Sequence, residues 1–98
     1  MKSDNSASGP VERLVDRVKA GPGGAMTDEV GVITGDLTIA TTLQSDGRAA
    51  VAVQYTDADE WYTLTGSPAP LPHPDGLRQL HDTVLEAIKA GGGAEVLT

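Results

Sequence analysis

The sequence predicts an α+β fold: a four-stranded antiparallel β-meander flanked by an N-terminal and a C-terminal helix, in the order α-β-β-β-β-α. Three observations support this prediction. Apolar residues recur at helical spacing near both ends, the middle of the chain alternates with the period of strands, and turn residues separate the alternating runs. A chain of 98 residues fits one domain with a small core. We expect this domain to span residues 10–90, between a disordered tail at 1–9 and a Gly-rich tail at 91–98.

The first helix is predicted to begin at Pro10, because proline suits the first helical position. Four apolar residues then follow at the spacing of one helical face: Val11, Leu14, Val15 and Val18. The Gly-Pro-Gly-Gly run at 21–24 is expected to end this helix and to form a flexible link to the sheet.

Four uncharged runs are predicted to be the strands, because every charge between Val30 and Thr65 lies at a turn. The runs are Val-Gly-Val-Ile-Thr at 30–34, Leu-Thr-Ile-Ala-Thr-Thr-Leu-Gln at 37–44, Ala-Ala-Val-Ala-Val-Gln-Tyr-Thr at 49–56 and Trp-Tyr-Thr-Leu-Thr at 61–65. Loops of two residues after the first run and three after the second keep one set of apolar side chains on the same face throughout.

These loop lengths also predict the register of each hairpin. The second hairpin is expected to pair Leu43 with Ala49. A two-residue loop in the third hairpin pairs Tyr55 with Tyr62, whereas a three-residue loop would turn Trp61 inward instead.

The alternating prolines at 68–74 predict an extended crossover, because proline fixes the backbone and is excluded from central strands. The second helix is expected to begin at Pro74 and to be capped by Gly91. Its predicted buried stripe comprises Leu77, Leu80, His81, Val84, Leu85 and Ile88. The tail that follows is expected either to fray or to dock as a short strand on a sheet edge.

Two helices side by side are wide enough to cover one face of four strands, so both are placed on the same face and the other face is predicted to be bare. An uncharged, exposed face of this kind is typical of an interaction site. The chain has one tryptophan, Trp61, which would point onto this face, and tryptophan is enriched in interface hot spots. The predicted contact residues are Trp61, Ile33, Ala40, Ala52 and Thr63.

The sequence therefore favours a small non-enzymatic interaction module that uses its uncharged face to bind a protein partner or to form a homodimer. A net charge of −7 disfavours nucleic acid and anionic membranes as partners. One alternative is an acidic inhibitor or immunity-type protein for a basic partner. Another is a small-molecule-binding protein or enzyme, with a pocket near the Pro-rich crossover lined by His73, His81, Tyr55 and Tyr62.

No residue pattern indicates a catalytic, cofactor or metal site. The chain has no cysteine, which excludes thiolate chemistry. The glycine run at 21–24 lacks the lysine and the strand-to-helix context of a phosphate loop. Asp57, Asp59 and Glu60 do not form the ligand array of a calcium loop. An acid–base role for His81, near Asp82, is a weaker interpretation than a core histidine with one hydrogen bond.

The N-terminal residues lack the apolar core of a signal peptide. No segment reaches the roughly 20 apolar residues that are needed to cross a bilayer. We therefore expect a cytoplasmic protein.

Overall fold

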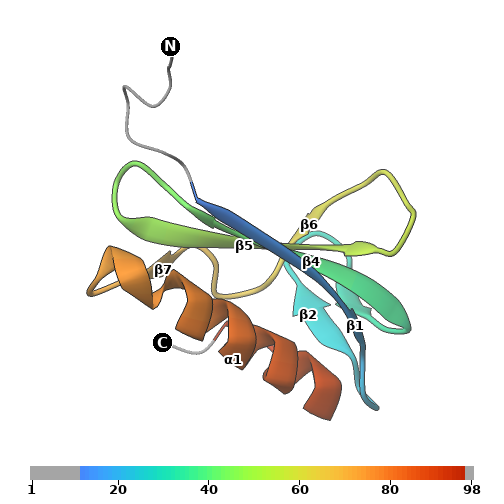
Figure 1. The fold of residues 1–98 in the computed structure, drawn as a ribbon. Coiled ribbons are helices and arrows are strands. Elements are labelled where there is room, and N and C mark those ends of the chain that lie inside the picture. The colour runs from blue at the N-terminus through green and yellow to red at the C-terminus, as the bar shows by residue number, and fades with distance from the viewer. Residues whose placement is uncertain (1–11, 97–98) are drawn as a thin grey trace.

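The computed structural model describes residues 12–96 and shows a sheet-rich fold with one long helix near its C-terminal end (Figure 1). The strands are β1 (Arg13–Lys19), β2 (Ala25–Thr27), β3 (Gly31–Ile33), β4 (Asp36–Leu43), β5 (Arg48–Tyr55), β6 (Tyr62–Thr63) and β7 (Ala69–Pro70). A short 3₁₀ helix (Pro74–Gly76) leads into α1 (Leu77–Ala90). The predicted order α-β-β-β-β-α is therefore wrong. The predicted tail at 1–9 lies outside the described residues.

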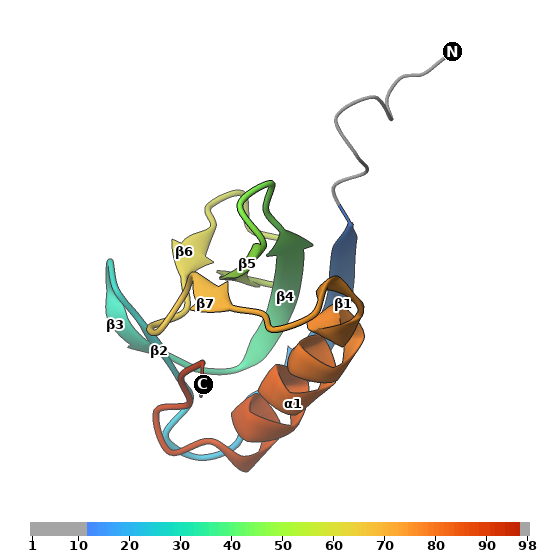
Figure 2. The ribbon, with the colours of Figure 1, turned by 90° about the vertical axis from the view of Figure 1, so that its left-hand side faces the viewer.

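The strands form two antiparallel sheets that curl around a common core. The main sheet has the order β1-β4-β5-β6, with β7 also pairing with β5, and β2 and β3 form a separate pair. Backbone hydrogen bonds of 3.0 Å join Asp28 to Thr63 and Thr65 to Met26, so the small sheet continues the curl beyond β6. Figure 2 shows this curvature of the strands, with α1 lying next to β1.

The segment predicted as the first helix is the edge strand β1, which pairs with β4 along its whole length. The apolar pattern of this segment fits a helix and a strand alike. Residues four apart, such as Leu14 and Val18, share one face in either conformation. As a strand, this segment hydrogen-bonds to one edge of β4, whose backbone N–H and C=O groups would otherwise lack partners. Every second residue is exposed, namely Arg13, Val15, Arg17 and Lys19, and of the residues between them Asp16 alone is also exposed.

Of the three predicted hairpins, one is confirmed, one is wrong and one has a different register. The second is confirmed, because Leu43 lies opposite Ala49. The first is wrong, because β3 pairs with β2, a three-residue strand too short to leave a pattern in the sequence. In the third, Val53 rather than Tyr55 lies opposite Tyr62. This register differs by two residues, so the loop is longer but the side chains keep their faces.

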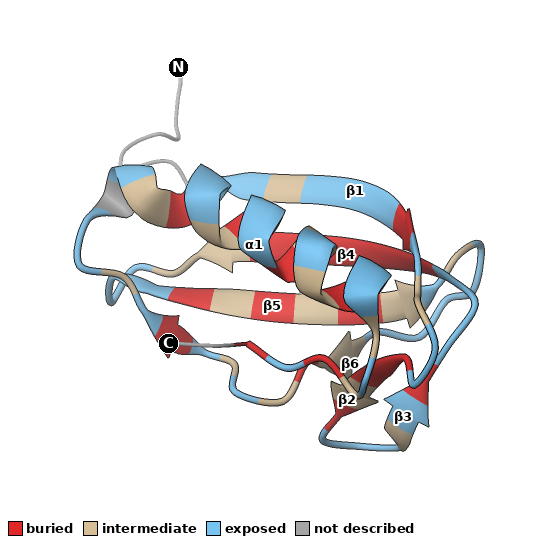
Figure 3. Cartoon of the chain, turned by 90° about the horizontal axis from the view of Figure 1, so that it is seen from below, coloured by how far each residue is buried: buried red, intermediate tan, exposed pale blue. Residues whose placement is uncertain are grey.

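The prediction that two helices cover one face is also wrong, because α1 is the one α-helix of the described residues, and it packs on the inner face at β1 and β4. Its predicted stripe is confirmed, as the red bands of α1 in Figure 3 indicate. Four of the stripe residues are buried and two are partly buried: Leu77, His81, Val84 and Ile88, then Leu80 and Leu85. They pack against aliphatic residues of the inner face that include Leu37, Ile39, Val51, Val53 and Leu64.

Two glycine-rich segments, 21–24 and 91–93, pack against each other and close the fold. The predicted link at 21–24 is therefore a packed element. The backbone N–H of Gly92 donates to the carbonyl of Pro22 at 2.7 Å, and two similar bonds follow along the same pair of segments. The chain then docks beside β2 through an isolated parallel bridge between Ala94 and Ala25. Of the two alternatives for the tail, docking is the one observed.

Gly21→Ala is expected to lower the free energy of unfolding by about 1–3 kcal/mol, because an added Cβ would overlap the backbone carbonyl oxygen of Lys89. The neighbouring backbone cannot yield without separating the two glycine-rich segments. Gly76→Ala is the matched control, since the nearest atom to its added Cβ is Cδ2 of Leu71 at 3.9 Å. Urea denaturation of both variants measures the difference, and equal losses would contradict this role for Gly21.

Candidate functional site

The candidate site lies on the outer face, which we define as the side of the main sheet opposite α1. Figure 1 shows α1 below the sheet and no described helix or strand above it. Strand register decides which side chains share this face, because alternate residues point to the same side. They are Arg13, Val15, Arg17 and Lys19 of β1, Asp36, Thr38, Ala40 and Thr42 of β4, Arg48, Ala50, Ala52 and Gln54 of β5, and Thr63 of β6.

The structure brings together four of the five predicted contact residues. Ala40 lies opposite Ala52, and Ala52 lies opposite Thr63. Trp61 stands two residues before Thr63 and extends over the same face. Ile33 lies elsewhere and is 2% exposed in the core. Its placement on the outer face was wrong because it assumed that β3 pairs with β4.

Trp61 contacts Arg13 across this face. The guanidinium carbon of Arg13 lies 5.5 Å from the centroid of the Trp61 ring, a cation–π contact. β4 and β5 separate β1 from β6, so the two side chains meet above the central strands. Ala40 is only 2% exposed although no described helix or strand covers it, which agrees with neighbouring side chains lying over it. The predicted bare face is therefore partly covered by its own residues.

The sequence did not predict Arg13 as a contact residue, because its segment was assigned to a helix. With the correct strand assignment, alternation alone would have placed its side chain beside Val15 and Arg17 on the outer face. Two large apolar side chains remain accessible there, since Trp61 is 37% exposed and Val15 is 44% exposed.

A hollow of about 430 Å³ lies beside Val15. Its lining residues are Val15, Asp16, Arg17, Thr38, Gln54, Thr56 and Asp57. The hydroxyl groups of Thr38 and Thr56 are 3.0 Å apart, and the side-chain amide of Gln54 donates to the carbonyl of Ala58 at 3.0 Å. Hydrogen-bond donors, hydrogen-bond acceptors and charges of both signs therefore line the hollow.

Acidic residues flank the face at β6. Glu29 accepts two hydrogen bonds of 2.7 Å from Thr63, one from its hydroxyl and one from its backbone N–H. These bonds lower the pKa of Glu29 below its usual value. Partial burial and the hydrogen bond that Tyr62 donates to Glu60 raise the pKa of the Tyr62 phenol. Thr63 is thus held by the turn between β2 and β3.

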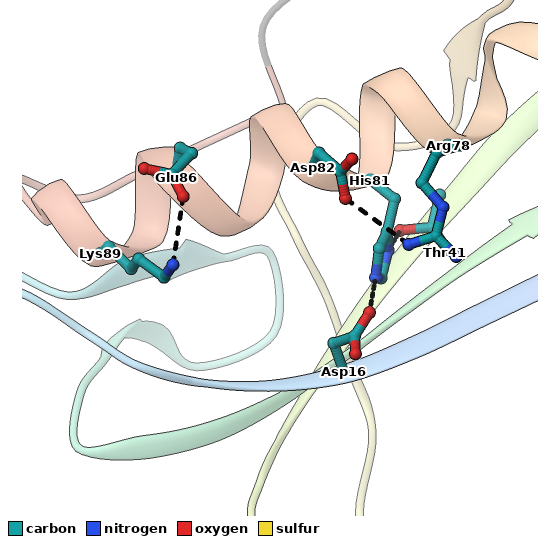
Figure 4. A network of polar contacts seen from close by, with 7 residues as sticks. All are labelled: Asp16, Thr41, Arg78, His81, Asp82, Glu86 and Lys89. Carbon is teal, nitrogen blue, oxygen red and sulfur yellow. Dashed lines mark hydrogen bonds and ion pairs between the residues drawn. The ribbon is translucent and has the colours of Figure 1, made fainter.

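The side chain of His81 points from α1 toward the main sheet and joins the helix to two strands (Figure 4). Its Nδ1 is 2.7 Å from the hydroxyl of Thr41 on β4, and its Nε2 is 2.7 Å from a carboxylate oxygen of Asp16 on β1. An ionised carboxylate only accepts, so Nε2 donates to it, and a neutral imidazole then accepts from Thr41 at Nδ1. His81 and Thr41 are both fully buried, so the pair fastens α1 to the sheet and presents no hydroxyl to a substrate.

A second cavity, of about 600 Å³, lies between the Pro-rich crossover and the start of α1. It is lined by Pro70, Leu71, Pro72, His73, Asp75, Gly76, Gln79, Leu80 and Thr83. Of the four residues predicted to line such a pocket, it contains His73 alone. The side chain of His81 is enclosed between α1 and the main sheet, and Tyr55 and Tyr62 belong to β5 and β6. No group of three potential metal ligands occurs within residues 12–96.

Comparisons of the chain with protein-family models, with curated proteins and with solved structures give no match. Among the described residues, no helix combines the length and apolar character that crossing a membrane requires. The function therefore has to be inferred from the surface itself.

His81→Ala is expected to lower the free energy of unfolding by about 2–4 kcal/mol, because it removes two hydrogen bonds and leaves the Thr41 hydroxyl buried without its partner. Gln79→Ala, on the exposed side of the same helix, is expected to stay within about 0.5 kcal/mol of the wild type. Urea denaturation measures both. A loss for His81→Ala no larger than that of the control would show that this contact does not hold α1 in place.

Glu29→Gln is expected to change the pH dependence of stability. The pKa of Glu29 is lowered on folding, so its carboxylate stabilises the fold above the ordinary value of 4.5, and this contribution is lost as the pH falls through the folded pKa. The stability difference between wild type and Glu29→Gln should therefore be constant at neutral pH and shrink below about pH 4.5. Glu86→Gln on α1 controls for the loss of one charge, and an identical pH profile for the two variants would contradict the prediction.

Proposed function

We propose that this chain is a non-enzymatic interaction module that binds another protein chain through its outer face. The contact between Arg13 and Trp61 is the observation that carries the proposal. It holds the chain's one tryptophan, 37% exposed, across a sheet face that no described element covers. Tryptophan and arginine are the residues most enriched in interface hot spots. Because the two side chains already hold each other, less side-chain entropy would be lost on binding.

The composition of the outer face supports the same proposal. Its central strands carry small, uncharged side chains such as Ala50 and Ala52, and the Arg13 and Trp61 side chains meet above these strands. The exposed side chain of Val15 adds apolar surface beside these strands. Apart from Arg13, the charged groups of the outer face lie at its rim: Arg17 and Lys19 on β1, and Asp36 and Arg48 at the strand ends. A centre with few charges and a polar rim are the usual anatomy of a protein interface.

The two alternative functions have less support. An acidic inhibitor of a basic partner needs carboxylates on its binding surface, but Asp36 is the one carboxylate among the outer-face residues of the described strands, and Glu29 and Asp28 beside them are engaged by the side chains of Thr63 and Thr65. A small-molecule site at the crossover would have to work with His73 as its one histidine, because His81 does not line that cavity.

Site-specific photo-crosslinking in the native cell tests this proposal. A benzoyl-phenylalanine at position 15, in place of Val15, is expected to capture a defined protein, whereas the same group in place of Gln79 on α1 is not. Trp61→Ala should then weaken binding of the purified partner by about tenfold or more. Tyr55→Ala is the matched control, since Tyr55 is 42% exposed but does not lie on the outer face.

Sedimentation of the purified chain identifies the kind of partner. A dimer that Trp61→Ala dissociates would mean that a second copy binds the outer face. A monomer that crosslinks to nothing through position 15, and that binds no protein differently after Trp61→Ala, would refute the proposal.

A further inference from the structure

The free edge of β1 presents backbone groups that no strand of residues 12–96 pairs with. At its two ends, the carbonyl of Glu12 accepts from Leu43 at 2.8 Å, and Ala20 donates to Gly35 at 2.9 Å. Alternate residues of an antiparallel strand bond to the same neighbour, so the even-numbered residues of β1 bond to β4. No strand of the described residues lies beyond β1 in the sheet. The residues whose N–H and C=O groups point to the free edge are Arg13, Val15, Arg17 and Lys19.

The same residues make this edge basic in an acidic protein. Arg13, Arg17 and Lys19 are three of the seven Lys and Arg residues in a chain whose net charge is −7. Within residues 12–96, Arg17 and Lys19 form no ion pair, although Asp36 lies opposite Lys19 in the register. Elsewhere cations pair with nearby carboxylates, as in Arg48 with Asp46, Arg78 with Asp82 and Lys89 with Glu86.

We propose that the β1 edge receives an extended acidic segment of a partner protein as an added antiparallel strand. This inference rests on the proposed function, because it names the chemistry of the protein that is bound. In strand addition, main-chain hydrogen bonds provide affinity and alternate side chains provide specificity. Read against the direction of β1, the segment follows the pattern Glu-x-Glu-x-Val-x-Glu, with its acids opposite Lys19, Arg17 and Arg13.

A second copy of the chain is the other obvious occupant, and the charge pattern disfavours it. If β1 pairs with its own copy about Asp16, Arg13 lies opposite Lys19. If it pairs about Val15, Arg13 lies opposite Arg17. Like charges directly opposite each other destabilise a strand pair, and charged edges are a known protection against edge-to-edge association. The cations that keep copies apart are the ones that an acidic strand would satisfy.

The added strand would also reach the outer face. Side chains of paired residues in neighbouring strands share a face, so the acidic side chains would lie beside the outer-face residues of β1. The acid opposite Arg13 would compete with the Trp61 ring for the guanidinium group. Because Trp61 is the one tryptophan of the chain, its fluorescence reports this event directly.

The first test uses a synthetic peptide, acetyl-Thr-Glu-Thr-Glu-Thr-Val-Thr-Glu-Thr-amide. It is expected to change Trp61 fluorescence and to protect the backbone amides of Arg13, Val15 and Arg17 from hydrogen exchange. The peptide with lysine in place of glutamate should not bind. Equal binding of the two peptides, or binding that leaves these amides unprotected, would overturn the proposal.

Backbone N-methylation separates strand addition from charge attraction. The amides of the glutamate and valine residues would donate to β1, whereas those of the threonines would point away. Methylating the amide of the glutamate opposite Arg17 should weaken binding by about tenfold or more, because it removes a hydrogen bond and places a methyl group in the strand pair. Methylating a threonine amide should change affinity by less than about twofold. Equal effects would overturn the proposal.

Matched charge reversals test the protein side. Arg17→Glu and Arg78→Glu change the net charge equally, but only the first alters the β1 edge. Arg17→Glu should weaken peptide binding by about tenfold or more, and Arg78→Glu should leave it unchanged. Equal losses would show attraction to the overall charge and would contradict strand addition.

The outcomes distinguish this inference from the proposed function. A partner that crosslinks through position 15 but binds Arg17→Glu as tightly as wild type would refute the added strand and leave the interaction surface intact. A dimer whose β1 amides are protected from exchange would also refute it, because a second copy would then occupy the edge.

Discussion

The buried imidazole of His81 is the contact on which the arrangement of the molecule depends. It hydrogen-bonds to Thr41 on a central strand and to Asp16 on the edge strand, so it specifies where α1 sits on the sheet. Buried polar contacts of this kind favour one arrangement, because every other placement leaves polar groups without partners. The contact also turns Asp16 inward. Since side chains alternate along a strand, Arg13, Val15 and Arg17 must then face outward. The outer face and its basic rim thus follow from one histidine on the opposite side of the sheet.

The features that could be predicted from the sequence are those specified over short distances. The register of β4 and β5 follows from alternation on both sides of a short loop, and the stripe of α1 follows from the spacing of its apolar residues. β1 could not be assigned this way, because Leu14 and Val18 satisfy helix and strand alike. Its conformation depends on β4, which lies far along the chain. The pairing of β2 with β3, and of Thr63 with the turn before β3, likewise has no local signature.

The candidate site was partly predictable for the same reason. Trp61 stood out because it begins an uncharged run, and the two-residue difference in the third hairpin preserved the faces of the neighbouring side chains. Arg13 and Ile33 depended on which strands pair, so one was missed and the other was misplaced. The partners of His81 are 40 and 65 residues away, a separation that no spacing rule reaches.

The packed glycine segments also affect how the chain can fold during synthesis. Residues 21–24 need residues 91–93 as their backbone partners, and β2 needs Ala94 beside it. A nascent chain that has emerged only through β5 therefore has its central hairpin but neither the helix nor the segment that closes the curl. Contacts between such distant residues carry a high entropic cost before they form and slow the folding of a small domain. The aliphatic inner face of the central strands therefore remains exposed to solvent until the last described residues have emerged.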